Sequence, residues 1–174
     1  KGTKVAMIPS EIIRFLDTSL TSIHGAAEIS TILTERGSRP LHIGDSWSVA
    51  PGEAFHVVLS GTVVAFRAGT DNPDTASVVI GAAHTDSPGL QLKERSARVV
   101  DGFLQIPVEV YGGPILATWL DRELLVAGRI VVHDDRARSG VKLLPFSSRR
   151  PWAIIPNLAI HFNREMNESL TYNR

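Results

Sequence analysis

The chain has 174 residues, of which 43% are hydrophobic and 21% charged, so it is expected to fold and is not intrinsically disordered. Its 18 lysines and arginines balance its 18 aspartates and glutamates, and this balance argues against nucleic acid or an anionic membrane as a partner. Cysteine is absent, which excludes disulfides, thiolate metal ligands and a cysteine nucleophile.

Two helices are expected at the start of the chain. Apolar residues recur at helical spacing from Ile12 to Leu20, after Ser10 as a predicted N-cap. A second helical pattern runs from Ala26 to Leu33, and Gly37 is its predicted stop. Residues 22–25 are expected to form a short connection between the two helices.

Strand signals follow the helices. Phe55–Leu59 and Thr62–Phe66 are rich in β-forming residues, and the pair Ser60-Gly61 between them predicts a hairpin turn. The continuous small-apolar run Ser77–Ala83 predicts a strand that is buried on both faces. Helices followed by strands indicate an α/β layer architecture.

The sequence changes character after Lys93. The remaining residues are mostly β-forming, apart from a predicted helix at Asn157–Asn163. We place a domain boundary within residues 94–100, which gives domains 1–96 and 97–174. The strand-like stretches beyond this boundary are Phe103–Tyr111, Leu124–His133 and Val141–Leu144.

His84 and Asp86 are the main site signal, because they follow the predicted buried strand directly. Ligands of open α/β sheets gather beyond the carboxyl ends of strands, and residues two apart in extended backbone project to the same side. Asp86 is therefore placed to accept the second ring N–H of a metal-bound His84. The pattern also suits a histidine that is satisfied by a nearby carboxylate in a turn, and both interpretations stay open at this point.

Three ordered blocks of the chain resemble the M18 metallopeptidase family. His84–Pro88, with Leu90 and Lys93, is similar to the family signature HTDSP-x-L-x-x-K. Val108–Arg129 resembles its VEVYGG…W-x-DR-x-L-x-x-AGR segment, and Ile155–Arg164 its IPNLAIH-x-NR segment. A weaker similarity falls on Ile23-His24. Three departures from the family pattern touch no presumed ligand: Glu94, Pro114 and Leu120.

The resemblance implies a fold and an activity. Residues 1–96 would form the N-terminal part of a helix-flanked, mixed-sheet zinc-peptidase domain, and residues 97–174 an incomplete β-rich dimerisation domain. The implied activity is metal-dependent removal of N-terminal residues from peptides, with acidic residues (Asp or Glu) among the expected substrates. Two Zn²⁺ ions per complete site are implied, although Mn²⁺ or Co²⁺ would also suit imidazole and carboxylate ligands.

The resemblance also implies roles for individual residues. His84 would be a zinc ligand, Asp86 would orient it, and His161 would reach into the active site of a partner subunit. The alternative for His161 is a structural histidine. In the family the remaining ligands and the general base lie downstream, so a C-terminal segment or companion chain of the same enzyme is an expected partner. We also expect a homo-oligomer built from dimers, up to a dodecamer, in the cytoplasm.

Two other functions compete with a peptidase. A non-catalytic assembly module would keep the dimerisation surface without a complete metal site. An enzyme using His84 and Asp86 as an acid–base pair with Ser87 is disfavoured, because a serine beside the aspartate is badly placed for a triad. The Asp121–Glu123 stretch suits either an interface role or a loop ion pair. His24 is expected to pack or to cap, and the histidines at positions 42, 56 and 133 are expected to be at the surface or half-buried.

Overall fold

The computed structural model describes residues 9–72, 75–94, 97–137 and 139–169. Contacts between residues group the chain into two compact units. The first contains residues 1–86 and 127–147, and the second contains residues 87–126 and 148–174. The expected division into domains 1–96 and 97–174 stays a prediction.

Both predicted helices are present in the first unit, with earlier starts than the sequence indicates. Helix α1 spans Pro9–Thr18, so its first residue is a proline, which suits this position because its missing N–H would be unpaired there anyway. Helix α2 spans Ser22–Glu35, because Thr21 serves as N-cap and its hydroxyl accepts the backbone N–H of His24 at 3.4 Å. No described helix is both long enough and apolar enough to cross a membrane.

The predicted stop of α2 at Gly37 is confirmed. Gly37 has a φ of +83°, in the left-handed region where glycine is least strained. Its N–H donates to the carbonyl of Thr34, and the N–H of Ser38 donates to the carbonyl of Leu33, each at 2.9 Å. This pair of bonds is a Schellman motif, which satisfies the last carbonyls of the helix.

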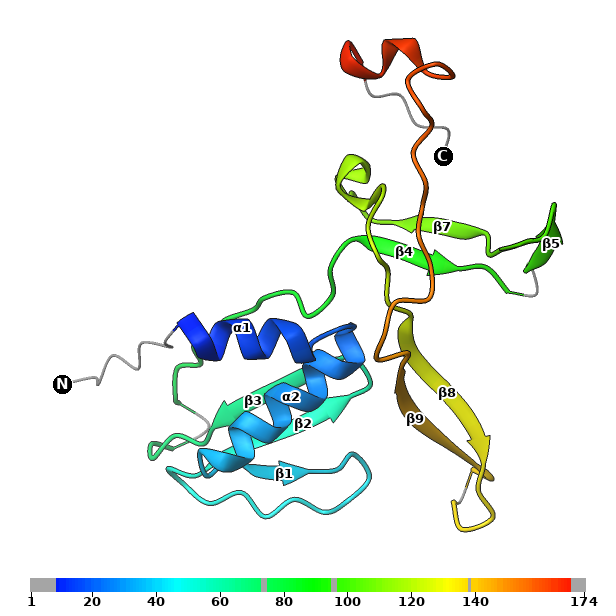
Figure 1. Cartoon of the computed structure of the whole chain (residues 1–174). Coiled ribbons are helices and arrows are strands. Elements are labelled where there is room, and N and C mark those ends of the chain that lie inside the picture. Colours follow the sequence, from blue (N-terminus) through cyan, green and yellow to red (C-terminus); the bar gives the residue numbers. More distant parts are fainter. Residues whose placement is uncertain (1–8, 73–74, 95–96, 138, 170–174) are drawn as a thin grey trace. The chain divides into compact units, whose positions relative to one another are not determined.

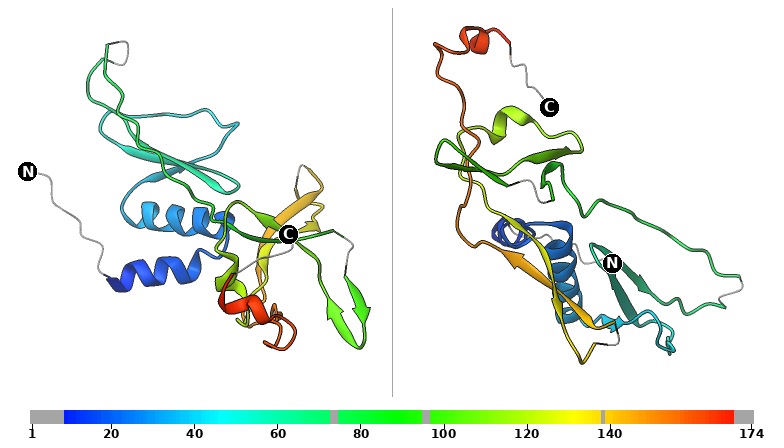
Figure 2. Two further views of the ribbon diagram at one scale, coloured as in Figure 1. Left: turned by 90° about the horizontal axis from the view of Figure 1, so that it is seen from above. Right: turned by 90° about the vertical axis from the view of Figure 1, so that its right-hand side faces the viewer.

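A three-stranded mixed sheet lies beneath the helices. Strand β1 (Arg39–Leu41) runs parallel to β2 (Ala54–Leu59), and β2 pairs antiparallel with β3 (Thr62–Arg67). Helix α2 covers one face of this sheet, and α1 packs on α2 (Figures 1 and 2). A small apolar core lies on the face of the sheet opposite α2, because Phe55 and Val57 alternate along β2 with His56, which contacts α2. In this core the rings of Phe55 and Phe66 stack with centroids 5.4 Å apart. The predicted strands and the Ser60-Gly61 hairpin are thus confirmed.

His56 corrects an expectation, because it is fully buried and does not lie at the surface. Its Nε2 lies 2.9 Å from the hydroxyl of Ser30 on α2, and its Nδ1 lies 2.9 Å from the hydroxyl of Ser38. Both ring nitrogens therefore have partners, as a buried polar group requires. The imidazole joins the end of α2 and the chain leaving it to the middle of strand β2.

The expected buried strand Ser77–Ala83 is wrong for this chain. The segment has no strand assignment, and the side chains of Val78, Val79 and Ile80 are 80%, 96% and 84% exposed. A strand buried on both faces needs neighbours in its sheet and covering elements above and below it. The part of the chain that the structure describes supplies neither for this segment.

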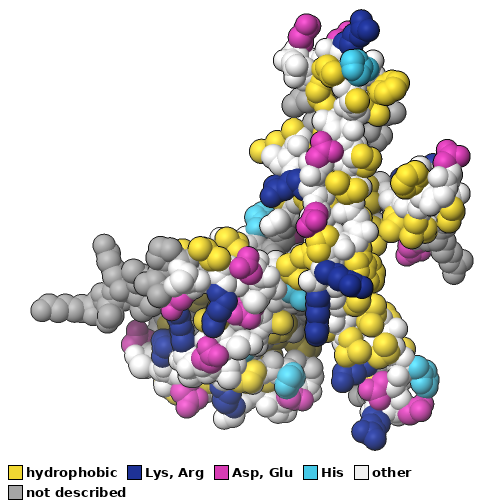
Figure 3. Space-filling model, viewed as in Figure 1, with side chains coloured by type: hydrophobic (Ala, Val, Ile, Leu, Met, Phe, Trp, Pro, Cys, Tyr) yellow, Lys and Arg dark blue, Asp and Glu magenta, His cyan; other side chains and the backbone are white. Residues whose placement is uncertain are grey.

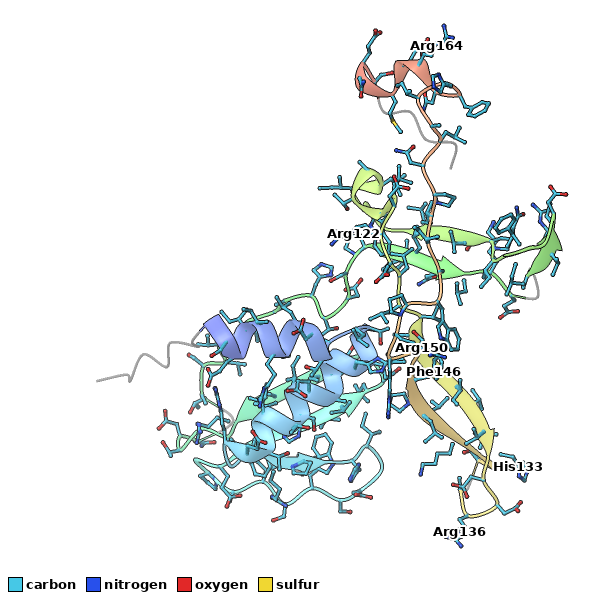
Figure 4. The ribbon with its side chains drawn as sticks, in the orientation of Figure 1. Arg122, His133, Arg136, Phe146, Arg150 and Arg164 are labelled. Carbon is cyan, nitrogen blue, oxygen red and sulfur yellow. The ribbon has the colours of Figure 1, made fainter. Side chains whose placement is uncertain are left out.

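The first unit also contains the hairpin of β8 (Ala127–His133) and β9 (Val141–Ser147). Apolar side chains remain exposed along it, as Figure 3 shows. His133 and Arg136 lie at its tip (Figure 4), and His133 is exposed as expected. The large exposed hydrophobic residues of the hairpin are Ile130, Val131, Val141 and Leu143.

The second unit contains two short antiparallel pairs. Strand β4 (Gly89–Leu92) pairs with β7 (Val108–Tyr111), and β5 (Arg98–Val100) pairs with β6 (Phe103–Gln105). The stretch predicted as Phe103–Tyr111 is therefore two strands with different partners. Two 3₁₀ turns, η1 (Leu116–Trp119) and η2 (Arg164–Asn167), complete the unit.

The predicted helix at Asn157–Asn163 is wrong. Only residues 160–162 form a turn, and η2 follows it. The backbone N–H of Asn157 donates to the Asp121 carboxylate at 2.9 Å, and the Asn157 side chain accepts the N–H of Leu158 at 2.9 Å. The next backbone bonds run from Phe162 to Ala159 and from Asn163 to Ile160, three residues apart, so the segment forms a turn and not an α-helix.

Candidate functional site

The predicted pair His84 and Asp86 meets in the structure. The Nδ1 atom of His84 lies 2.9 Å from Oδ1 of Asp86. The side chain of His84 is 89% exposed, and that of Asp86 is 39% exposed. The two-residue spacing that predicted a shared side of the backbone thus gives a direct contact.

This contact decides which ring nitrogen is available to a ligand. An ionised carboxylate only accepts hydrogen bonds, so Nδ1 of His84 carries the proton in the neutral ring. The lone pair then lies on Nε2, which is the form that ligates a metal ion. A carboxylate on the second ring nitrogen is the usual companion of a metal-bound histidine. The residues present therefore fit one histidine ligand of a zinc site.

Thr85 connects this pair to the folded part of the first unit. Its hydroxyl donates to the carbonyl of Gly61, in the β2–β3 turn, at 2.6 Å. Thr85 itself is half-buried, in contrast to His84 beside it. The sequence pattern predicted no role for this threonine, although its place between the two site residues was a usable signal.

The described residues contain no group of three or more histidine, aspartate or glutamate side chains that could hold a metal ion. A catalytic zinc ion ordinarily has three protein ligands. The described residues alone therefore do not complete such a site, and the role of His84 and Asp86 in one stays a prediction.

His161, the second predicted site histidine, lies in the second unit. It is exposed, in the turn formed by residues 160–162, directly before η2. Its ring has no hydrogen-bond partner among the described residues, so it is free to approach another molecule. The role of His161 in the active site of a partner subunit stays a prediction.

The Asp121–Glu123 stretch joins two of the sequence blocks within the second unit. The backbone N–H of Asp121 donates to the carbonyl of Ile155, and its carboxylate accepts the N–H of Asn157, both at 2.9 Å. Arg122 (Figure 4) extends from the same loop, with Nη1 at 3.5 Å from the carbonyl of Thr118. Asp121 therefore acts by positioning the segment that leads to His161, and it forms no ion pair among the described residues.

The remaining predicted positions have structural roles. His24 contributes to the first turn of α2, with Nδ1 at 2.8 Å from the Thr21 hydroxyl. Gly112, with a φ of +69°, passes close to Pro88, where a Cβ atom would lie 3.4 Å from the proline side chain. Glycine suits this position because its φ lies in the left-handed region.

One hollow, of about 430 Å³, lies elsewhere in the first unit. It contains none of the predicted site residues. Its lining is formed by Arg36, Gly37, Arg39, Glu53, Ala54 and Arg67.

The fold and the pair define a mixed α/β protein with a histidine prepared for metal ligation. The profile of the family described as aminopeptidase I zinc metalloprotease (M18) matches residues 15–174. The chain therefore belongs to the M18 family, as the resemblance of the three blocks predicted. It is 39% identical over 163 residues to the probable M18 family aminopeptidase 2 of Pseudomonas putida (strain GB-1), covering 93% of this chain and 37% of that protein.

Solved structures agree with this assignment. The chain is similar to one in the cryo-EM structure of the Ape4 and Nbr1 complex, with 33% identity and a TM-score of 0.86 over 94% of this chain and 31% of that one. Chaetomium thermophilum mApe1 is 28% identical, with a TM-score of 0.75 over 87% of this chain and 35% of that one. The chain thus spans between about a third and two fifths of the length of such relatives.

Proposed function

We propose that this chain is part of a metal-dependent aminopeptidase that hydrolyses N-terminal residues from peptides. The observation that carries the proposal is the 2.9 Å contact between Nδ1 of His84 and the Asp86 carboxylate. It leaves Nε2 as the ligating atom on a well-exposed ring. Two bound zinc ions would supply Lewis acidity toward the scissile carbonyl and a more acidic attacking water.

The proposed division of labour follows from what the chain contains. His84 contributes one zinc ligand, Asp86 orients it, and His161 positions substrate in the site of a neighbouring subunit. The remaining ligands and the general base come from a C-terminal segment or companion chain. We use the term complete enzyme for this chain together with the residues that supply those ligands.

The exposed apolar segment supports the need for such a partner. Val78, Val79 and Ile80 are at least 80% exposed, shortly before His84. Exposed contiguous apolar surface commonly marks an interaction site. In the complete enzyme, this segment would be a strand between neighbours that the described residues lack.

We further propose a homo-oligomer built from dimers, with residues 97–174 as the dimerisation domain, in the cytoplasm. One solved structure with the same fold is described as an S. cerevisiae mApe1 dodecamer, which makes a dodecamer the largest assembly to test for. Analytical ultracentrifugation of the complete enzyme is the direct measurement. A monomer at micromolar concentration would contradict the proposal.

The decisive experiment is metal analysis and a peptidase assay of the complete enzyme and of His84→Ala. A matched control is His133→Ala, because His133 also precedes an aspartate by two residues, with Nδ1 at 3.6 Å from Asp135, and is also exposed. We expect His84→Ala to lose zinc and peptidase activity, and His133→Ala to keep both. Peptides with N-terminal Asp or Glu should be compared with neutral and basic ones.

The same experiment separates a peptidase from a non-catalytic assembly module. That alternative is favoured by the absence of three-ligand groups among the described residues. It predicts no zinc and no hydrolysis from any preparation of the complete enzyme, with the oligomer intact.

A further inference from the structure

His84 needs an anchor that its own surroundings do not provide. The residues before it, 77–83, belong to no strand, and its side chain is 89% exposed. A metal ligand must nevertheless be held in a defined position for tight binding. The contact with Asp86, which lies on the same segment, fixes the orientation of the ring.

Thr85, the half-buried residue between His84 and Asp86, joins this segment to the folded unit. Thr85 lies at a bend of the chain, and it is half-buried whereas His84 is exposed. Its hydroxyl donates to the carbonyl of Gly61 at 2.6 Å, a contact that joins residues 24 positions apart. Its own carbonyl oxygen lies 4.0 Å from the place a Cβ on Gly25, in α2, would occupy. The threonine therefore contacts the folded unit, whereas the side chain of His84 beside it is 89% exposed.

The acceptor of this bond is itself held firmly. Strands β2 and β3 are joined by the two-residue loop Ser60-Gly61, so the ladder fixes the loop from both sides. Ser22, the first residue of α2, lies close to Gly61. A Cβ added to Gly61 would lie 2.5 Å from Oγ and 2.9 Å from Cβ of Ser22. From strand β8, Nη1 of Arg129 donates to the Ser60 hydroxyl at 3.1 Å.

From these contacts we infer that Thr85 is a positioning residue for His84. Its hydroxyl ties the metal-ligand segment to the β2–β3 turn, which α2 and β8 hold in place. The inference rests on the proposed function, because it takes His84 as a zinc ligand. The inference also explains why a glycine suits position 61 in addition to its place in the turn. A larger residue would meet Ser22 and push the Gly61 carbonyl, which accepts the Thr85 hydroxyl, away from α2.

The test is the zinc affinity of the complete enzyme, measured by competition with a chelator. Thr85→Val keeps the shape of the side chain and removes the donor, whereas Thr85→Ser keeps the hydroxyl. Thr31→Val is the matched control, because the Thr31 hydroxyl also donates to a backbone carbonyl, that of Ala27 at 3.1 Å, within α2. Thermal unfolding of the zinc-free proteins reports any purely structural effect.

We expect Thr85→Val to weaken zinc binding about tenfold, the lower end of what supporting residues of metal ligands contribute. Thr85→Ser and Thr31→Val should bind zinc as the unmodified enzyme does. Gly61→Ala is a second variant acting on the acceptor, and it should weaken zinc binding in the same direction.

The results separate the inference from the proposed function on which it rests. If His84→Ala weakens zinc binding and Thr85→Val does not, the positioning role is wrong and the ligand assignment stands. Thr85→Val with a lower unfolding temperature but unchanged zinc affinity would overturn the positioning role in the same way. If His84→Ala itself leaves zinc binding unchanged, the proposed function fails and the inference fails with it.

Discussion

Gly61→Ala is a direct probe of how closely α2 meets the β2–β3 turn. An added Cβ would lie 2.5 Å from Oγ and 2.9 Å from Cβ of Ser22, and 3.4 Å from its carbonyl carbon. The hydroxyl can rotate away, but the Cβ of Ser22 cannot move without the first turn of the helix. Carbon atoms pack comfortably at about 3.5–4.0 Å, so the turn and the helix must separate by roughly 0.6 Å.

Overpacking of this kind costs about 1–3 kcal/mol of unfolding free energy. In a chain of this size, each kcal/mol lowers the midpoint of thermal unfolding by about 2–4 °C. Unfolding is followed by circular dichroism, with Gly69→Ala as control, because its nearest non-neighbouring atom lies 4.0 Å from the added Cβ. We expect a lower midpoint for Gly61→Ala only.

A rescue variant sharpens this result. Ser22→Gly removes both the Oγ and the Cβ that the new methyl group of Gly61→Ala would meet, so the double variant should lose less stability than the two single changes together. If Gly61→Ala unfolds at the same temperature as Gly69→Ala, the turn and the helix are not in close contact. If the stability losses of Gly61→Ala and Ser22→Gly simply add in the double variant, the two residues are likewise not in close contact.

Three further predictions concern other contacts. His56→Leu should cost about 1–3 kcal/mol of stability in denaturant unfolding, because it leaves the buried Ser38 hydroxyl without its partner; an unchanged midpoint would contradict this. Gly37→Ala should cost about 1–2 kcal/mol, since a residue with a Cβ is strained at a φ of +83°; it can be compared with Gly69→Ala in the same assay. Asp121→Ala should speed hydrogen exchange of the Asn157 amide, whereas Asp121→Asn keeps an acceptor and should slow it toward the unmodified rate. Equal exchange in both Asp121 variants would show that the side chain does not hold this segment.

Local signals in the sequence predicted the elements that are stabilised locally. The apolar spacing of both helices, the glycine that ends α2 and the Ser60-Gly61 hairpin all depend on residues close together in the chain. The pair His84 and Asp86 belongs to the same class, since its members are only two residues apart and the chain bends at Thr85 between them. Its contact is confirmed, whereas its role toward a metal ion stays a prediction.

Contacts between distant residues were beyond the reach of the sequence. The partners of His56 lie 26 and 18 positions away, so no local pattern distinguishes its burial from an exposed histidine in a strand. The bond from Thr85 to Gly61 spans 24 positions and was missed for the same reason. The sequence indicates Gly61 only as part of a turn, whereas in the structure its nearest neighbour in another element is Ser22 of α2.

The prediction of a buried strand at residues 77–83 was wrong for a different reason. Its composition indicates a strand with neighbours on both sides, yet burial depends on what surrounds a segment as well as on its residues. Val79, 96% exposed, has no such surroundings in the described residues. The predicted helix at Asn157–Asn163 is replaced by a turn whose backbone bonds join residues three apart, although its apolar spacing indicated a helix.

The central claim is that Nε2 of His84 ligates zinc while Nδ1 is held by Asp86. A crystal of the complete enzyme, with diffraction recorded on both sides of the zinc absorption edge, tests it most directly. We expect an anomalous peak about 2.0–2.1 Å from Nε2 of His84, with the Asp86 carboxylate still on Nδ1. A zinc peak remote from His84, or bound through Nδ1 with Asp86 turned away, would contradict it.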